Sequence, residues 1–267
     1  MPINNDPRLI KNEARARILA AMPTVTLVSL IWFVIKSVVW LLGLELSGAN
    51  RIFAEVYALV GDTLTLAQYT ELVQSNIIYE LIVRNTSTVG TLLTYALIIC
   101  SSIIEAGFAW YSLRISRGEK PDYKSLFDGF MRFKRVLWLS VLRGVLVLIG
   151  FYLFVIPGIF VWLLFSLAIR LCYDNPSRTA VECLRRSARL MHTRKLAMAW
   201  LMMTFIGWFF VGFFVSLFAL LPLTDIFMNI YIAVSISVFY NNVLLSLNPT
   251  PPEAQSEPTN AEPPSSK

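Results

Sequence analysis

The sequence predicts an all-α membrane protein, a bundle of six transmembrane helices with amphipathic helices at the membrane surface. Of its 267 residues, 56% are hydrophobic and only 15% are charged, whereas soluble domains average about 45–50% and about 25%. Long apolar runs recur along the chain, and basic residues gather in the short segments between them. This combination excludes a typical soluble enzyme, a disordered chain and a disulfide-rich secreted domain.

The apolar runs predict where the chain crosses the membrane, because about 20 apolar helical residues span a bilayer. We expect spans at about 23–42, 89–113, 136–155, 159–173, 196–221 and 226–247. The third and fourth spans form one apolar run, and Pro157 and Gly158 near its middle predict a tight helical hairpin, because proline stops a helix and glycine permits a reversal. Each arm is short, so a re-entrant hairpin is the alternative.

Basic residues set the expected topology. Of the 23 Lys and Arg residues, 17 lie in 1–22, 114–135 and 178–195, and short loops rich in such residues stay in the cytoplasm. Six spans then place both termini in the cytoplasm and the acidic segment 43–88 outside. A cleaved signal peptide over 24–42 is the alternative, although Lys36 interrupts that run and no A-x-A site follows it.

The remaining segments complete the predicted organisation. Residues 1–22 form a basic cytoplasmic segment, 23–247 form the membrane domain, and the proline- and serine-rich tail 248–267 is too polar to fold. The outside segment has apolar residues at helical spacing from Leu66 to Leu81, which predicts amphipathic helices.

The cytoplasmic segments pair aromatic or apolar residues with cations, a pattern that suits lipid headgroups. Asn175 and Pro176 predict a helix start, after which apolar residues occupy one face and arginines the other. The candidate contacts for anionic lipid are Arg185, Arg186, Arg189, Lys134 and Arg135. The alternative is generic anchoring of the helix without lipid selectivity.

Charges within the predicted spans are costly and mark a second candidate site. Glu105 and Arg143 lie at matching depths in the second and third spans, so they are expected to pair, either as a structural ion pair or as a polar site for an ion or a headgroup. Lys36 and Arg170 are nearer to the ends of their spans, where their side chains can reach polar surroundings, and Asp174 is a candidate partner for Arg170.

Sequence features of enzymes are missing. The single histidine, His192, excludes a histidine cluster, and the chain has no HExxH, GxSxG or phosphate-binding glycine loop. None of the three cysteines is expected outside, so no structural disulfide is expected. We therefore expect no catalytic residue, no metal and no cofactor, and no nucleic-acid partner either, because no recognition motif accompanies the positive charge.

Seven short strings over roughly 89–245 resemble, in order and spacing, the bacterial integral-membrane family called domain of unknown function 975. They are Arg117-Gly118-Glu119-Lys120-Pro121, Leu126-Phe127-Asp128-Gly129-Phe130, Ile156-Pro157-Gly158-Ile159, Asp174-Asn175-Pro176, Ser187 with Leu190-Met191 and Lys195, Phe205-Ile206-Gly207-Trp208, and Phe239-Tyr240. The resemblance implies a multi-pass protein of the bacterial plasma membrane and no agreed substrate. It also implies a distant similarity to the membrane domain of some glycerophosphodiester phosphodiesterases, whose catalytic domain this chain lacks.

These strings also have structural interpretations. Asp174-Asn175-Pro176 is expected to end one span and start a surface helix. Gly207 is expected to permit a close helix approach that buries Trp208 within the bundle. The leading functional hypothesis is a non-enzymatic membrane protein that binds lipid or a partner protein in the bacterial envelope. The alternative is a transporter or channel for a small solute, with Glu105 and Arg143 lining its path.

Overall fold

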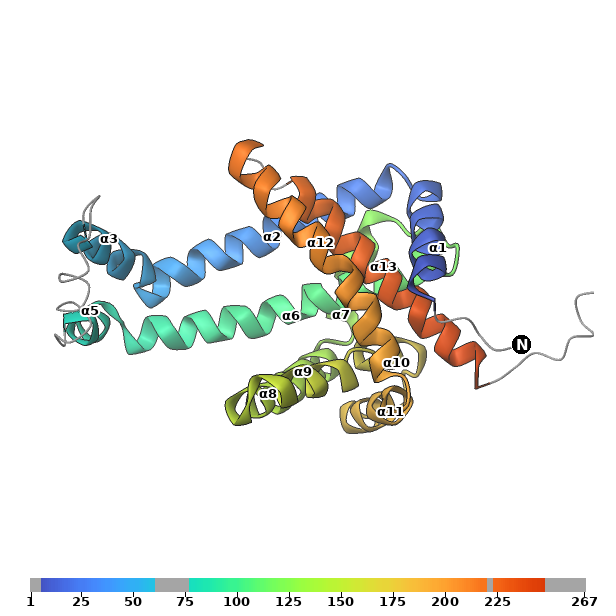
Figure 1. The fold of residues 1–267 in the computed structure, drawn as a ribbon. Coiled ribbons are helices and arrows are strands. Elements are labelled where there is room, and N and C mark those ends of the chain that lie inside the picture. The colour runs from blue at the N-terminus through green and yellow to red at the C-terminus, as the bar shows by residue number, and fades with distance from the viewer. Residues whose placement is uncertain (1–5, 61–76, 220–222, 248–267) are drawn as a thin grey trace, which may run out of the picture.

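The computed structural model describes residues 6–60, 77–219 and 223–247, and these residues form helices and no strands (Figure 1). Six helical segments are long and apolar enough to cross a membrane. They are Thr24–Ser47, Thr88–Ser116, Phe133–Leu153, Val155–Asp174, Lys195–Gly212 and Ile226–Leu245. The predicted all-α, multi-pass membrane fold is thereby confirmed, whereas the side on which the termini lie stays a prediction.

The N-terminal basic segment is itself a helix, α1 (Pro7–Ala20). Asp6 caps it by accepting a hydrogen bond from the Arg8 backbone N–H, and Pro7 occupies the first turn, where a missing N–H costs nothing. Its buried face consists of Ile10, Ala14 and Ile18, which pack in the main core. The basic N-terminal segment is therefore a packed part of the helical bundle and not only a carrier of positive charge.

Two long helices form an extended hairpin. α2 (Thr24–Ser47) lies beside α6 (Thr88–Ser116), and their far ends carry α3 (Ala49–Val60) and α5 (Ile77–Asn85), away from the rest of the bundle (Figure 1). Gly48, at φ 78°, ends α2 in the left-handed conformation that glycine adopts without strain. Most of the predicted amphipathic run Leu66–Leu81 lies outside the described residues, as does the tail 248–267.

The predicted hairpin of spans three and four is present, but its turn lies elsewhere. The short helices η1 (Tyr123–Phe127) and α7 (Asp128–Met131) lead into α8 (Phe133–Leu153). The hairpin turns at Phe154, which is extended, and α9 (Val155–Leu164) begins directly after it. Pro157 thus lies in the first turn of α9, where its missing N–H leaves no helical carbonyl without a donor. Placing the turn at Pro157 and Gly158 was wrong.

Gly158 serves helix packing instead. A Cβ at Gly158 would lie 2.5 Å from ring atoms of Phe151, and a Cβ at the facing Gly150 would lie 3.0 Å from the Gly158 Cα. The two glycines let α8 and α9 approach closely. The fourth span then breaks at 165–167 and continues as α10 (Ala168–Asp174).

Three helices complete the fold. α11 (Ala180–His192) lies between the fourth and fifth spans, α12 (Lys195–Ala219) leads away from it, and α13 (Leu223–Leu245) returns across α6 and α1 (Figure 1). The largest fully buried side chains include Trp110, Tyr111, Phe205, Phe239 and Tyr240. The core is therefore concentrated near the basic segments, whereas the far half of α6 is largely exposed.

The expected burial of Trp208 was wrong. Trp208 is 50% exposed, and a Cβ at Gly207 would meet no atom within 4 Å. This part of α12 presents Ile206, Phe209 and Phe210 outward as well. An outward apolar face suits hydrocarbon chains, because a membrane-spanning helix gains nothing by hiding apolar side chains from lipid.

Candidate functional site

The arginine face of α11 is positioned by a well-capped amphipathic helix. The expected helix start at Asn175 and Pro176 was wrong, because α11 begins at Ala180 and Thr179 is its N-cap. The Thr179 side chain accepts a hydrogen bond from the Glu182 backbone N–H, and the Glu182 carboxylate accepts one from the Thr179 N–H, which forms a capping box. The opposite face is anchored in the protein by Cys183, Leu184, Ser187 and other buried residues. Ser187 also donates a hydrogen bond to the Leu164 carbonyl at 2.7 Å. The arginines are thus presented from a fixed element.

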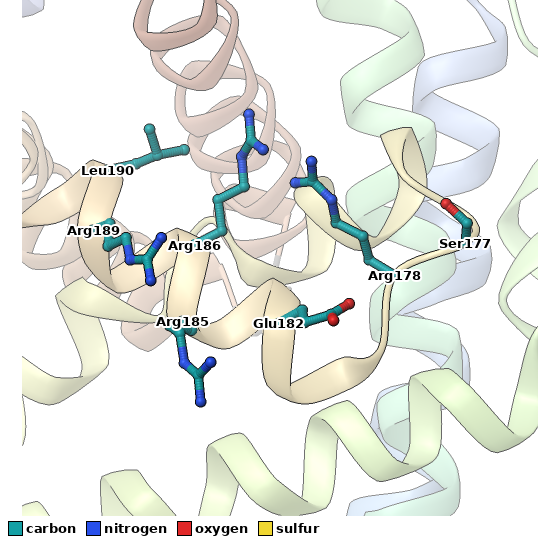
Figure 2. Close-up of a pocket in the computed structure, with 7 residues that line it drawn as sticks. All are labelled: Ser177, Arg178, Glu182, Arg185, Arg186, Arg189 and Leu190. Carbon is teal, nitrogen blue, oxygen red and sulfur yellow. The ribbon is translucent and has the colours of Figure 1, made fainter.

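Four arginines surround one hollow of about 660 Å³ on this helix. Its lining consists of Ser177, Arg178, Glu182, Arg185, Arg186, Arg189 and Leu190 (Figure 2). Arg178 and Arg186 extend toward the same side of the helix, and Arg185 points the other way (Figure 2). Within the described part of the chain, none of the four guanidinium groups makes a hydrogen bond or an ion pair.

The charge of this hollow is strongly positive. Its lining contains four arginines and a single carboxylate, Glu182, which accepts a hydrogen bond from the Thr179 N–H at the helix start. The capping hydrogen bonds lower the pKa of Glu182 below its usual value, so the carboxylate stays ionised. The hollow therefore offers at least three unneutralised cations with free donors, an arrangement that suits a polyvalent or clustered anion.

The other two predicted lipid contacts lie apart from this hollow. Arg135, near the start of α8, donates hydrogen bonds to the carbonyls of Pro176 at 2.6 Å and Asn175 at 2.5 Å. It also lies 3.4 Å from the Cys183 sulfur. Arg135 thereby ties α8 to the loop before α11. Lys134 is exposed beside it.

Cys183 is a second unusual group on α11. A hydrogen bond from the Cys172 thiol, together with the Arg135 guanidinium, lowers the pKa of the Cys183 thiol to about 6. Both sulfurs are buried. The thiol donor and the guanidinium both favour the thiolate form of Cys183.

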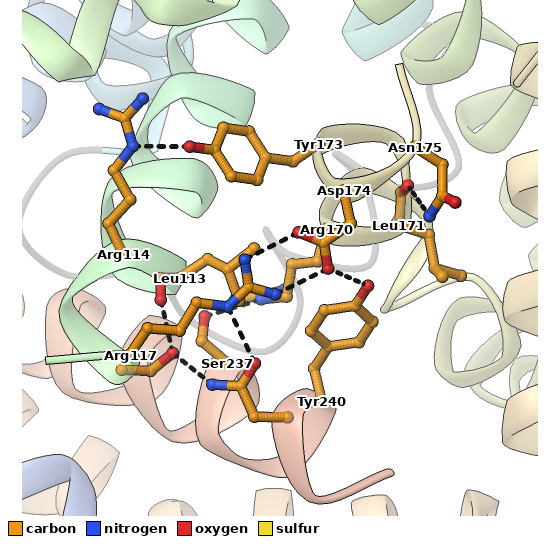
Figure 3. A network of polar contacts seen from close by, with 12 residues as sticks. Leu113, Arg114, Arg117, Arg170, Leu171, Tyr173, Asp174, Asn175, Ser237 and Tyr240 are labelled. Atoms are coloured by element: carbon orange, nitrogen blue, oxygen red, sulfur yellow. Dashed lines mark hydrogen bonds and ion pairs between the residues drawn. The ribbon is translucent and has the colours of Figure 1, made fainter. Parts of the chain in front are cut away.

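Three of the strings quoted for the family resemblance meet in one polar network at the basic end of the bundle (Figure 3). Arg117 binds Asp174 through both carboxylate oxygens, at 2.8 and 2.7 Å, and the Tyr240 hydroxyl donates to the same carboxylate at 2.7 Å. The hydrogen bonds to Asp174 raise the pKa of Arg117 above its usual value. The network joins the end of α6 to α10 and α13.

The expected local pair between Arg170 and Asp174 was wrong. Arg170 is buried, and it donates to the Ser237 hydroxyl of α13 at 2.8 Å (Figure 3). It also donates to the Ala233 carbonyl of the same helix at 2.9 Å. Asp174 is engaged by Arg117 and Tyr240 instead. Both side chains therefore serve contacts between helices that lie far apart in sequence.

The predicted intramembrane site is a groove between helices. Glu105 and Arg143 line one cavity of about 230 Å³. The expected ion pair between Glu105 and Arg143 is not formed within 4 Å, and Glu105 pairs instead with Lys36 on α2, whose Nζ lies 3.8 Å from the carboxylate. Lys36 therefore reaches a partner within the bundle instead of turning to the membrane surface.

Sequence reasoning missed several members of these sites. Arg178 lies before the helical period of α11 begins, and only its nearness to Arg185 in sequence indicated that it could belong to the same site. Lys36 was assigned to the membrane edge because its pairing with Glu105 depends on the crossing of α2 and α6. Nothing in the sequence indicated the role of Tyr240 except that it belongs to one of the strings quoted for the family resemblance.

The described residues contain no group of three His, Cys, Asp or Glu side chains that could hold a metal ion. Comparison of the chain with protein-family models, with curated proteins and with solved structures finds no match.

Proposed function

We propose that the protein is a non-enzymatic protein of the bacterial plasma membrane that binds anionic phospholipid at its cytoplasmic face through α11. The observation that carries this proposal is the hollow lined by Arg178, Arg185, Arg186 and Arg189, whose guanidinium groups make no hydrogen bond and no ion pair within 4 Å with the described residues. The bacterial setting rests on the strings quoted for the resemblance to the domain of unknown function 975, because no family model matches the chain.

Anionic phospholipid suits this hollow in two ways. Guanidinium groups bind phosphate in a bidentate manner, and each cation near an anionic membrane surface contributes about 1 kcal/mol. α11 directly precedes the fifth span, so its arginines are held near the level at which headgroups lie.

The test is native mass spectrometry of the full-length protein, purified in mild detergent and mixed with equal amounts of phosphatidylglycerol and phosphatidylcholine. We expect the natural protein to retain phosphatidylglycerol preferentially. The triple change Arg185→Gln, Arg186→Gln, Arg189→Gln should reduce that retention about tenfold or more, by the contribution of each cation.

A matched control removes the same charge elsewhere. Arg8, Lys120 and Lys124 are exposed and lie outside the hollow, so their joint replacement by Gln should leave the preference unchanged. Equal retention of both lipids by the natural protein, or an equal loss in the control, would overturn the proposal. Raising the salt concentration should weaken the preference, because exposed charges are screened.

A further inference from the structure

Three charged side chains converge at one depth inside the bundle. Lys36 on α2, Glu105 on α6 and Arg143 on α8 each lie ten to twelve residues from the helix end that borders the basic segments. At 1.5 Å per residue, this places them about 15–18 Å along their helices. All three therefore lie well inside the hydrocarbon region if the spans cross the membrane as their length and composition indicate.

The charges do not cancel. Lys36 pairs with Glu105 at 3.8 Å, and this ion pair uses the single carboxylate among the residues that line the groove. Arg143 makes no hydrogen bond and no ion pair within 4 Å with the described residues. A guanidinium without hydrogen-bond acceptors inside a membrane is costly. Glu105 and Arg143 line the groove and Lys36 lies beside it, so the cluster of three has a net charge of +1, which an anion would neutralise.

The groove is shaped for a small polar group. Its wall offers the hydroxyl of Ser140, which has no hydrogen bond with any described residue, and the exposed carboxylate side of Glu105. Gly144 leaves room, since a Cβ there would meet no atom within 4 Å. The cavity of about 230 Å³ is smaller than the roughly 300–1,000 Å³ of pockets for drug-sized ligands. It fits a headgroup-sized ion, with Trp162 and Val147 as apolar walls for an attached chain.

We propose that this groove binds a single oxyanion, a carboxylate or phosphate group, between Arg143 and Ser140 within the membrane. Arg143 supplies a bidentate, charge-assisted contact, and Ser140 supplies one further donor. Glu105 limits the net charge of the site to +1 and so favours a monoanion over a dianion. The oxyanion belongs either to a membrane-dissolved amphiphile such as a fatty acid or to a free ion from solution.

The experiment measures the binding of radiolabelled palmitate to full-length protein in uncharged detergent by scintillation proximity. We expect saturable binding that unlabelled palmitate displaces and that hexadecanol, which has the same chain without the acidic group, does not. Displacement by acetate or inorganic phosphate at millimolar concentration assigns the site to free ions, and its absence assigns the site to amphiphiles. No specific binding of palmitate, acetate or phosphate, or equal displacement by hexadecanol, overturns the proposal.

Two opposite substitutions separate this site from a purely structural ion pair. Arg143→Gln should weaken binding about tenfold or more, because it removes the charge-assisted contact. Glu105→Gln should strengthen it severalfold, because it frees Lys36 and raises the net charge to +2. A folded Glu105→Gln protein that binds more weakly, or a folded Arg143→Gln protein that binds normally, contradicts the proposal.

Two further variants distinguish a loss of binding at the groove from misfolding and from binding at the α11 hollow. Gly144→Leu fills the groove without changing its charge and should abolish binding, with size-exclusion chromatography as the check on folding. Arg186→Gln changes the hollow on α11 and should leave palmitate binding unchanged. An equal loss in Arg186→Gln would show that the signal comes from α11, and the groove would not be a site.

Discussion

Asp174 holds three helices together with one carboxylate. It accepts two hydrogen bonds from Arg117 at the end of α6 and one from Tyr240 on α13, while belonging to α10 itself. Its side chain is only 17% exposed, so water does little to replace these contacts. The ion pair between Arg117 and Asp174 is therefore expected to link the helices and to contribute more to stability than an exposed surface ion pair does.

We expect Asp174→Asn to destabilise the protein by about 2–3 kcal/mol, since Arg117 then loses its partner in a partly buried place. Tyr240→Phe removes one hydrogen bond and should cost about 1 kcal/mol. Thermal unfolding in detergent, compared between the two variants and the natural protein, measures both. An Asp174→Asn protein that unfolds at the natural temperature would show that the network carries no stability.

Cys183 makes the stability depend on pH. Its folded pKa of about 6 lies below the ordinary thiol value of about 8.5, so the unfolded chain binds more protons between these pH values. The free energy of unfolding should therefore rise with pH between about 6 and 8.5, and this contribution is lost as the pH falls through 6. The groups that act on the thiol are Cys172, Arg135 and Arg178.

The measurement is the unfolding temperature in detergent at several pH values. Cys183→Ser should flatten the rise between pH 6 and 8.5, whereas Cys100→Ser, which changes an exposed cysteine on α6, should keep it. An unchanged slope in Cys183→Ser would mean that the thiol is protonated in the folded protein at neutral pH.

Two glycines show, at the level of elements, what sequence can and cannot tell about helix packing. Gly207 was expected to permit a close approach, yet its position faces open space. Gly107 on α6 does so instead: a Cβ there would lie less than 2 Å from the Leu126 carbonyl oxygen of η1. Both glycines lie in apolar helices with aromatic neighbours. Only the packing of η1 against α6 distinguishes them, and that packing depends on distant segments.

We expect Gly107→Ala to destabilise the protein by more than about 2 kcal/mol, because backbone must move to admit the methyl group. Gly207→Ala should be neutral or stabilise by up to about 1 kcal/mol, through helix propensity alone. Unfolding temperatures in detergent measure the difference. If the two changes had equal effects, η1 would not be seated on α6 as described.

Other elements were predictable in kind but not in detail. Apolar length sufficed to predict six spans, because the requirement of about 20 apolar residues is strict. The break after Leu153 was misplaced because Pro157 can stop a helix or begin one. For the candidate site, the helical period predicted the arginine face of α11 from Arg185 to Arg189. Lys36 and Tyr240 were missed because their contacts join helices more than 60 residues apart.

At the scale of the whole molecule, burial and positive charge concentrate at the same end. The core residues of α1, α6 and α13 lie near the basic segments, and the α2–α6 hairpin extends away from them to α3 and α5 (Figure 1). Short basic segments remain in the cytoplasm. The packed end is therefore expected to face the cytoplasm, and the hairpin tip with α3 and α5 is expected to lie outside.

Single cysteines test this orientation. In a background with Cys100, Cys172 and Cys183 replaced by Ala, we expect Arg51→Cys on α3 to react with a membrane-impermeant maleimide in intact cells. Lys120→Cys, before η1, should react only after the cells are permeabilised. Both positions are exposed, so a difference in reactivity reports the side of the membrane and not burial. Labelling of Lys120→Cys in intact cells would show that the topology is the reverse of the expected one. The α11 arginines would then not lie at the cytoplasmic leaflet, whose anionic lipids the proposed function requires.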